Sequence, residues 1–84
     1  MELSQEIISL VHTDFISVEQ QLVIDQLLSV ELKHVMADSR RNLNNTRLSI
    51  LKLAKGDSDA VIELTQIAKI DFRDVILWAT LDNN

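Results

Sequence analysis

Lys52-Leu53-Ala54-Lys55-Gly56-Asp57-Ser58-Asp59 contains the clearest helix boundary in this sequence of 84 residues. Gly56 is its one glycine, and glycine adopts the left-handed conformation of a C′ residue without a side-chain penalty. The lysines before Gly56 suit the negative end of a helix dipole, and Asp57 offers a carboxylate that caps the next helix. The stretch therefore predicts two helices joined by a tight turn.

Apolar residues recur at three- and four-residue spacings on both sides of this boundary. One side of the helix before it carries Leu43, Arg47, Ile50, Leu51 and Ala54, and one side of the helix after it carries Val61, Leu64, Thr65 and Ala68. Asp71 then predicts the N-cap of a short fifth helix with Asp74 at position N3. Its apolar residues, Val75-Ile76-Leu77-Trp78 and Leu81, surround the helix almost completely, which predicts a contact surface beyond the core.

The N-terminal half has weaker boundaries. A first helix is predicted over Leu3 to Val11, with a break at His12-Thr13-Asp14. Ser17 and Gln20 have the spacing of a capping box, which predicts a second helix from there through Met36. The asparagine-rich stretch 39–46 predicts a turn. Because neither proline nor glycine interrupts the chain there, the alternative is one continuous helix over 18–55.

The composition fits a single helical domain over residues 1–84. Hydrophobic residues make up 46% of the sequence, with no proline and no cysteine. We expect a compact all-α bundle of four to five short helices. Apolar residues cover roughly two thirds of the second helix, more than one core face requires, so we expect dimerisation to complete the bundle. The candidate interface residues are Leu27, Val30, His34, Val75, Trp78 and Leu81.

Several classes of function are excluded by residues that are missing. A single glycine excludes the glycine-rich loops that cradle nucleotides, and the absence of cysteine excludes thiol nucleophiles, iron–sulfur clusters and zinc fingers. No nucleophile stands near a recognisable base, so we predict no enzyme activity, no catalytic residue, no cofactor and no small-molecule substrate. No apolar run approaches 18 residues and the N-terminus is acidic, so we predict no membrane association and a cytoplasmic location.

One polar cluster interrupts the second predicted helix. Helical projection places Glu31, His34 and Asp38 close together. Glu31 and His34 have the Glu-x-x-His spacing of di-iron bundles, but such a site needs two of these motifs and two further carboxylates, so we predict no metal. The favoured interpretation is a hydrogen-bonded polar seam, and a pH-sensitive interface histidine is the alternative.

The formal net charge of −5 is distributed in three blocks. Residues 1–39 and 56–84 are acidic, whereas residues 40–55 contain five basic residues and no acidic one. Arg40, Arg41 and Arg47 are therefore the candidate anion-binding residues. Nucleic-acid binding is only an alternative, because the chain is acidic overall and has few aromatic residues for base stacking.

Three segments resemble a family. Asn45-Thr46-Arg47, Leu53-Ala54-Lys55-Gly56-Asp57 and Ala68-Lys69-Ile70-Asp71-Phe72-Arg73-Asp74-Val75-Ile76-Leu77-Trp78-Ala79 form a pattern that resembles the C-terminal half of small uncharacterised all-helical bacterial proteins. The resemblance covers roughly the last 40 residues. It implies a bacterial helical bundle with no assigned activity and no catalytic residue.

Together these features predict a non-enzymatic, homodimeric protein-interaction module whose partner is a second copy or another protein. The alternative is a nucleic-acid-associated protein that uses the basic segment 40–55.

Overall fold

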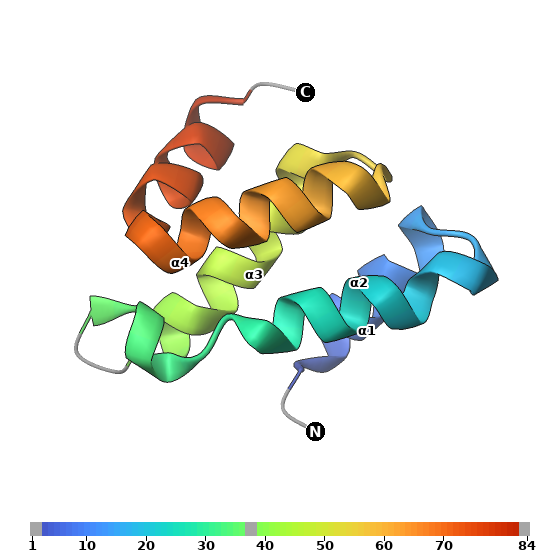
Figure 1. The fold of residues 1–84 in the computed structure, drawn as a ribbon, viewed down its shortest axis with the longest axis horizontal. Helices are drawn as coiled ribbons and strands as arrows, with labels where there is room; N and C mark the ends of the chain where they lie inside the picture. Colours follow the sequence, from blue (N-terminus) through green and yellow to red (C-terminus); the bar gives the residue numbers. More distant parts are fainter. Residues whose placement is uncertain (1–2, 37–38, 83–84) are drawn as a thin grey trace.

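The computed structural model describes residues 3–36 and 39–82 (Figure 1). Its elements are α1 (Gln5–Asp14), α2 (Ser17–Ser29), the short 3-10 helix η1 (Leu32–His34), α3 (Arg40–Ala54) and α4 (Ser58–Leu81). The described residues form no strand, so the predicted all-α bundle is confirmed. The most extensive contact joins α3 to α4, and α2 packs on α4, while α1 packs on α2 and α3.

The predicted boundary between α3 and α4 is confirmed. Lys55 and Gly56 both have positive φ angles, of 51° and 84°, and the Lys55 N–H donates to the Leu51 carbonyl. A Cβ atom on Gly56 would lie 3.0 Å from the carbonyl oxygen of Asp14, so the end of α1 approaches this turn closely. The Asp57 carboxylate accepts hydrogen bonds from Asp59 N at 2.9 Å and Ala60 N at 3.4 Å, which caps α4.

The predicted extension of the second helix to Met36 is wrong, and so is the alternative of one helix over 18–55. The last residue of α2 is Ser29, whose Oγ donates to the Gln26 carbonyl at 2.6 Å and competes with the helical bonds. Val30 is extended, and the chain then turns so that both Val30 and Val35 are buried. The wide apolar arc predicted for one helix is thus divided between α2 and the segment after it.

The turn predicted over the asparagine-rich stretch 39–46 is also wrong, because α3 already begins at Arg40. The Ser39 hydroxyl accepts a hydrogen bond from Asn42 N at 3.1 Å and caps the helix. Thr46 is fully buried and donates to the Asn42 carbonyl at 2.7 Å. A cap before the stretch and a buried side chain within it outweigh the weak helix propensity of asparagine.

Two predictions for the N-terminal helices need correction. The first helix does not break at His12, because α1 continues to Asp14. Ser17 is not an N-cap: Ile16 occupies that position, and no side chain caps the first turn of α2. Gln20 instead donates from Nε2 to the Phe15 carbonyl at 2.9 Å, so it fixes the loop before the helix.

A kink at Asp71 divides α4. Asp71 has non-helical angles (φ −151°, ψ 96°), and its Oδ1 accepts a hydrogen bond from Arg73 N at 3.1 Å. The fifth helix predicted from this residue is therefore the second part of α4, residues 72–81, which we call the C-terminal segment. Figure 1 shows this segment turning sharply away from the first part of α4.

The core closes within one chain. The accessible surface is 5097 Å², close to the roughly 5,100 Å² expected for a folded monomer of this size. Its largest fully buried side chains include Ile7, Leu27, Ile50 and Leu51. These side chains are covered within the single chain, and the homodimer stays a prediction from the sequence.

Among the helices of residues 3–36 and 39–82, none has both the length and the apolar character that a membrane crossing requires.

Candidate functional site

The C-terminal segment presents apolar side chains on two faces. Phe72, Val75 and Ala79 follow helical spacing and are buried against the rest of the chain. Leu77, Trp78 and Leu81 lie on the other side, with exposed fractions of 53%, 41% and 67%. We call these three residues the outer stripe. Apolar side chains therefore lie on both the buried and the exposed side of this segment, and the contact surface beyond the core stays a prediction.

The six predicted interface residues separate into three groups. Leu27, Val30 and Val75 are fully buried inside the single chain, so their assignment to a surface is wrong. Trp78 and Leu81 are exposed, whereas His34 is half-buried in η1, on a different element. The list also missed Leu77, although this residue belongs to the helix predicted to be apolar all round.

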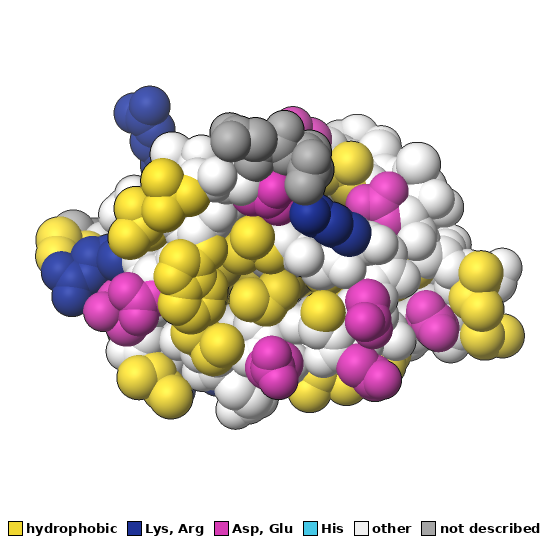
Figure 2. All heavy atoms as spheres, turned by 90° about the horizontal axis from the view of Figure 1, so that it is seen from above, with side chains coloured by type: hydrophobic (Ala, Val, Ile, Leu, Met, Phe, Trp, Pro, Cys, Tyr) yellow, Lys and Arg dark blue, Asp and Glu magenta, His cyan; other side chains and the backbone are white. Residues whose placement is uncertain are grey.

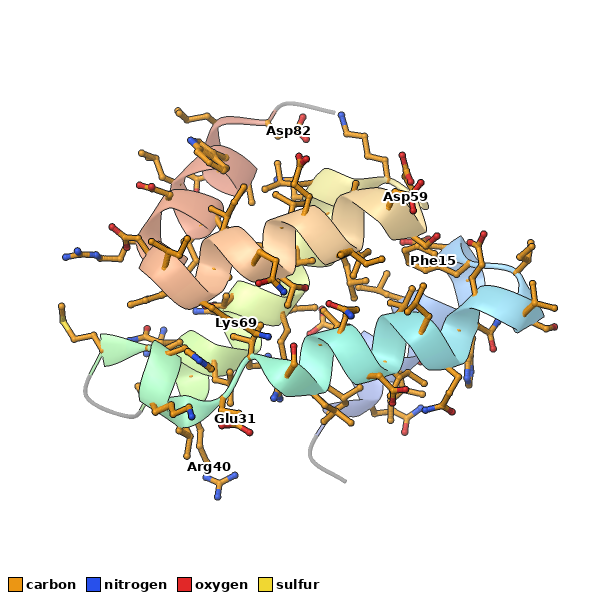
Figure 3. The ribbon with its side chains drawn as sticks, in the orientation of Figure 1. Phe15, Glu31, Arg40, Asp59, Lys69 and Asp82 are labelled. Atoms are coloured by element: carbon orange, nitrogen blue, oxygen red, sulfur yellow. The ribbon has the colours of Figure 1, made fainter. Side chains whose placement is uncertain are left out.

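An exposed carboxylate lies on the same side of the helix as the outer stripe. Asp74 is exposed and precedes Leu77 by three residues and Trp78 by four, so it lies on the same side of the helix. Figure 2 shows hydrophobic side chains gathered on one half of this face, with acidic side chains on either side and few basic ones. In Figure 3, Asp59 and Asp82 lie on the upper side, from which Figure 2 is seen.

Basic groups near the stripe are engaged by neighbouring carboxylates. Lys55 Nζ lies 3.3 Å from Asp82 Oδ2, and Arg73 Nε donates to Asp71 Oδ1 at 3.1 Å. The hydrogen bonds from the Arg73 side chain and backbone lower the pKa of Asp71, and that carboxylate in turn raises the pKa of Arg73. This pair therefore stays charged and adds no net charge to the surface.

Arg47, predicted to bind anions, lies inside the protein. Only 4% of the residue is exposed, and its guanidinium donates from Nε to the Leu27 carbonyl at 2.9 Å and from Nη2 to the Val30 carbonyl at 2.8 Å. These carbonyls belong to the C-terminal end of α2, where the helix dipole favours a cation. We conclude that Arg47 caps α2 from α3, and its assignment as a surface anion-binding residue is wrong.

The rest of the basic segment 40–55 is only partly available to an anion. Arg40 and Arg41 are exposed at the start of α3. Lys52 Nζ donates to the Ala79 carbonyl at 2.8 Å, and Lys55 forms the ion pair with Asp82. The five predicted basic residues therefore do not form one continuous surface.

The polar cluster predicted on the second helix is not helical, because α2 ends before it. Glu31 N donates to His34 Nδ1 at 2.9 Å across η1, and Lys33 Nζ lies 3.7 Å from Glu31 Oε1. Asp38 lies outside the described residues. In the part of the chain that the structure describes, no group of three His, Cys, Asp or Glu side chains is placed to hold a metal ion.

Two surface pockets lie beside α3. One, of about 330 Å³, lies between α3 and the C-terminal segment, near Lys52 and Thr80. The other, of about 260 Å³, lies between the end of α2 and the start of α3 near Leu28, Arg40 and Arg47. Neither lining contains a histidine or a pair of carboxylates.

Comparisons with protein-family models, with curated proteins and with solved structures gave no match. The resemblance to small bacterial helical proteins therefore stays a prediction from the sequence.

Proposed function

We propose that this protein is a protein-interaction module and that the outer stripe is its contact surface. The observation that carries the proposal is the exposure of Leu77, Trp78 and Leu81 on a helix whose opposite face is already buried. Together they expose apolar surface on the order of 300 Å², at the lower end of patches that are often functional on monomers. We propose no enzyme activity. The cytoplasm and a bacterial source remain predictions from the sequence.

The size of the stripe sets the strength of the contact. Burying the stripe and an equal area on a partner would contribute about 15 kcal/mol at 25 cal/mol per Å². Losses of translational, rotational and side-chain freedom cost a comparable 4–15 kcal/mol or more. The stripe alone thus supports only weak association, and the charges around it select the partner.

A pair of charge-introducing substitutions on the stripe tests this proposal. In the stripe variant, Leu77→Asp and Leu81→Asp place two carboxylates at i and i+4 of the stripe. The matched control, Val18→Asp and Leu22→Asp, likewise replaces two exposed apolar side chains by carboxylates at i and i+4, but on α2. Each protein is used as bait in a bacterial lysate, and the retained proteins are measured by mass spectrometry.

We expect the wild type and the control to retain the same proteins and the stripe variant to lose them. Equal retention by all three proteins would contradict the proposal. Light scattering of the purified wild type over a dilution series reports whether a second copy is among the partners.

The alternative of nucleic-acid association depends on the exposed side chains of Arg40 and Arg41. If it holds, the wild type is retained on DNA or RNA with a steep salt dependence, and Arg40→Ala with Arg41→Ala removes that retention. Arg47 is left unchanged in this test, because its substitution would disturb the fold.

A further inference from the structure

We propose that the outer stripe binds a basic amphipathic helix of another protein. The apolar side of that helix would lie on Leu77, Trp78 and Leu81, and its Lys and Arg side chains would face the surrounding carboxylates. This inference rests on the proposed function, because it names the partner of the same surface.

The shape of the stripe fits a helix. Its residues lie at i, i+1 and i+4 of one helical segment, so they form a ridge that can pack against the apolar face of a second helix. The C-terminal segment has ten residues and is therefore about 15 Å long, which corresponds to two to three turns of a facing helix. Helices that dock in this way present anchors at i, i+3, i+4 and i+7.

The charges around the stripe favour a basic partner. The described residues of α4 and its two caps carry six acidic residues and two basic ones. Of the two bases, Arg73 is bound to Asp71, and Lys69 lies below α4 in Figure 3, on the side opposite Asp59. Asp74 lies within the reach of the stripe, and Asp59 and Glu63 are exposed on the first part of α4. Lys and Arg on the partner would be attracted to this face and oriented by it.

The same charges disfavour a second copy. A two-fold contact through the stripe would bring two acidic faces together. A standard interface also buries about 800 Å² per partner, which is well above the area of the stripe. An anionic membrane surface would be repelled for the same electrostatic reason.

Trp78 is the only tryptophan in the sequence and reports directly on the stripe. The probe is a synthetic helix of about 18 residues, built from Leu on one side and Lys on the other. We expect its saturable binding to shift the emission of Trp78 to shorter wavelength and to protect it from acrylamide. A peptide of the same composition in scrambled order, and one with Glu in place of Lys, are the controls for shape and charge.

Substitutions in the protein locate the contact. Loss of two anchors in the stripe variant should weaken binding about tenfold or more. Asp74→Asn should weaken it a few-fold and reduce its salt dependence. The Val18→Asp, Leu22→Asp control should bind as the wild type does. Leu77→Ser with Leu81→Ser repeats the test without added charge, and far-UV circular dichroism checks that each variant is folded.

Two results would overturn the partner assignment while the proposed function stands. One is a wild-type dimer in light scattering whose Trp78 emission is already blue-shifted without peptide. The other is equal binding of the Lys, Glu and scrambled peptides, which would contradict a basic helix as the partner. In that case the proposed function still stands if the stripe variant, but not the control, fails to retain the lysate proteins. If the stripe variant binds the Lys helix and the lysate proteins as well as the wild type does, both proposals fail.

Discussion

The two connections that flank α3 differ in what fixes them. At the α3–α4 turn, Gly56 supplies the left-handed conformation and Asp57 supplies the cap, so the boundary is encoded in adjacent residues. At the α2–α3 connection, residues 30–39, the last carbonyls of α2 are bound by Arg47, which is 17 and 20 residues further along the chain. The first boundary was predicted correctly and the second was not, because only the first one is local.

The strongest test of this difference is the removal of Arg47. Arg47→Ala leaves the buried carbonyls of Leu27 and Val30 without these two donors and takes a cation from the end of α2, which should cost about 3–5 kcal/mol of unfolding free energy. Urea denaturation followed by circular dichroism measures this loss. Arg47→Lys should recover part of it, because an ammonium keeps the charge but lacks the two-pronged geometry. A loss below about 1 kcal/mol, the size of an exposed ion pair, would show that α2 ends for local reasons.

The sequence pattern around Arg47 is compatible with two roles, one in the core and one at the surface. Arg47 shares the apolar side of α3 with Leu43 and Ile50, a position that points into the core, yet it was also assigned to a surface that binds anions. A charged residue in a core stripe indicates burial with a partner. The partner could not be predicted, because the spacing within α3 holds no information on where α2 ends.

The candidate site was predicted only in part for a related reason. The periodicity of the sequence distinguishes apolar from polar positions of a helix. It does not show which of the apolar positions are buried by the rest of the same chain. Val75 and Trp78 looked equivalent in the sequence, and only the packing of the C-terminal segment against the core separates them. Three features could be predicted without knowing how the elements pack on one another. They are the all-α class, the α3–α4 boundary and the beginning of a helical segment at Asp71.

At the local boundary, Gly56→Ala should cost about 1–3 kcal/mol, because a φ of 84° is strained for alanine and its Cβ would lie 3.0 Å from the Asp14 carbonyl oxygen. Thermal and urea denaturation measure the loss. Gly56→Asn separates the two causes, since asparagine tolerates positive φ but has the same Cβ. If Gly56→Asn loses as much unfolding free energy as Gly56→Ala, the contact between the added Cβ and the end of α1 is the main cause. The turn would then depend on α1 as well as on its own residues.

Loss of the Asp57 cap, next to Gly56, should lower the unfolding free energy by less. Asp57→Ala removes the acceptor for Asp59 N and Ala60 N and should cost about 1 kcal/mol. Asp57→Asn keeps an acceptor oxygen and should retain most of that stability. Chemical denaturation of both variants checks the ranking. An equal loss in Asn and Ala would show that the charge at the helix N-terminus matters more than the hydrogen bonds.

The smallest effect is expected at Asp71, where α4 kinks next to the surface that carries the outer stripe. Hydrogen bonds from Arg73 lower the pKa of the Asp71 carboxyl below its usual value of 3.8. The folded form therefore binds this proton less readily than the unfolded form, so the stabilisation is complete above that value and is lost as the pH falls through and below it. NMR shifts of the Trp78 indole and of the amides in the C-terminal segment, followed from neutral to acidic pH, should show this loss.

Asp71→Asn should remove the response while Asp74→Asn retains it, because Arg73 donates its hydrogen bonds to Asp71. The same response in both variants would mean that packing against the core, and not the local cap, determines where α4 bends.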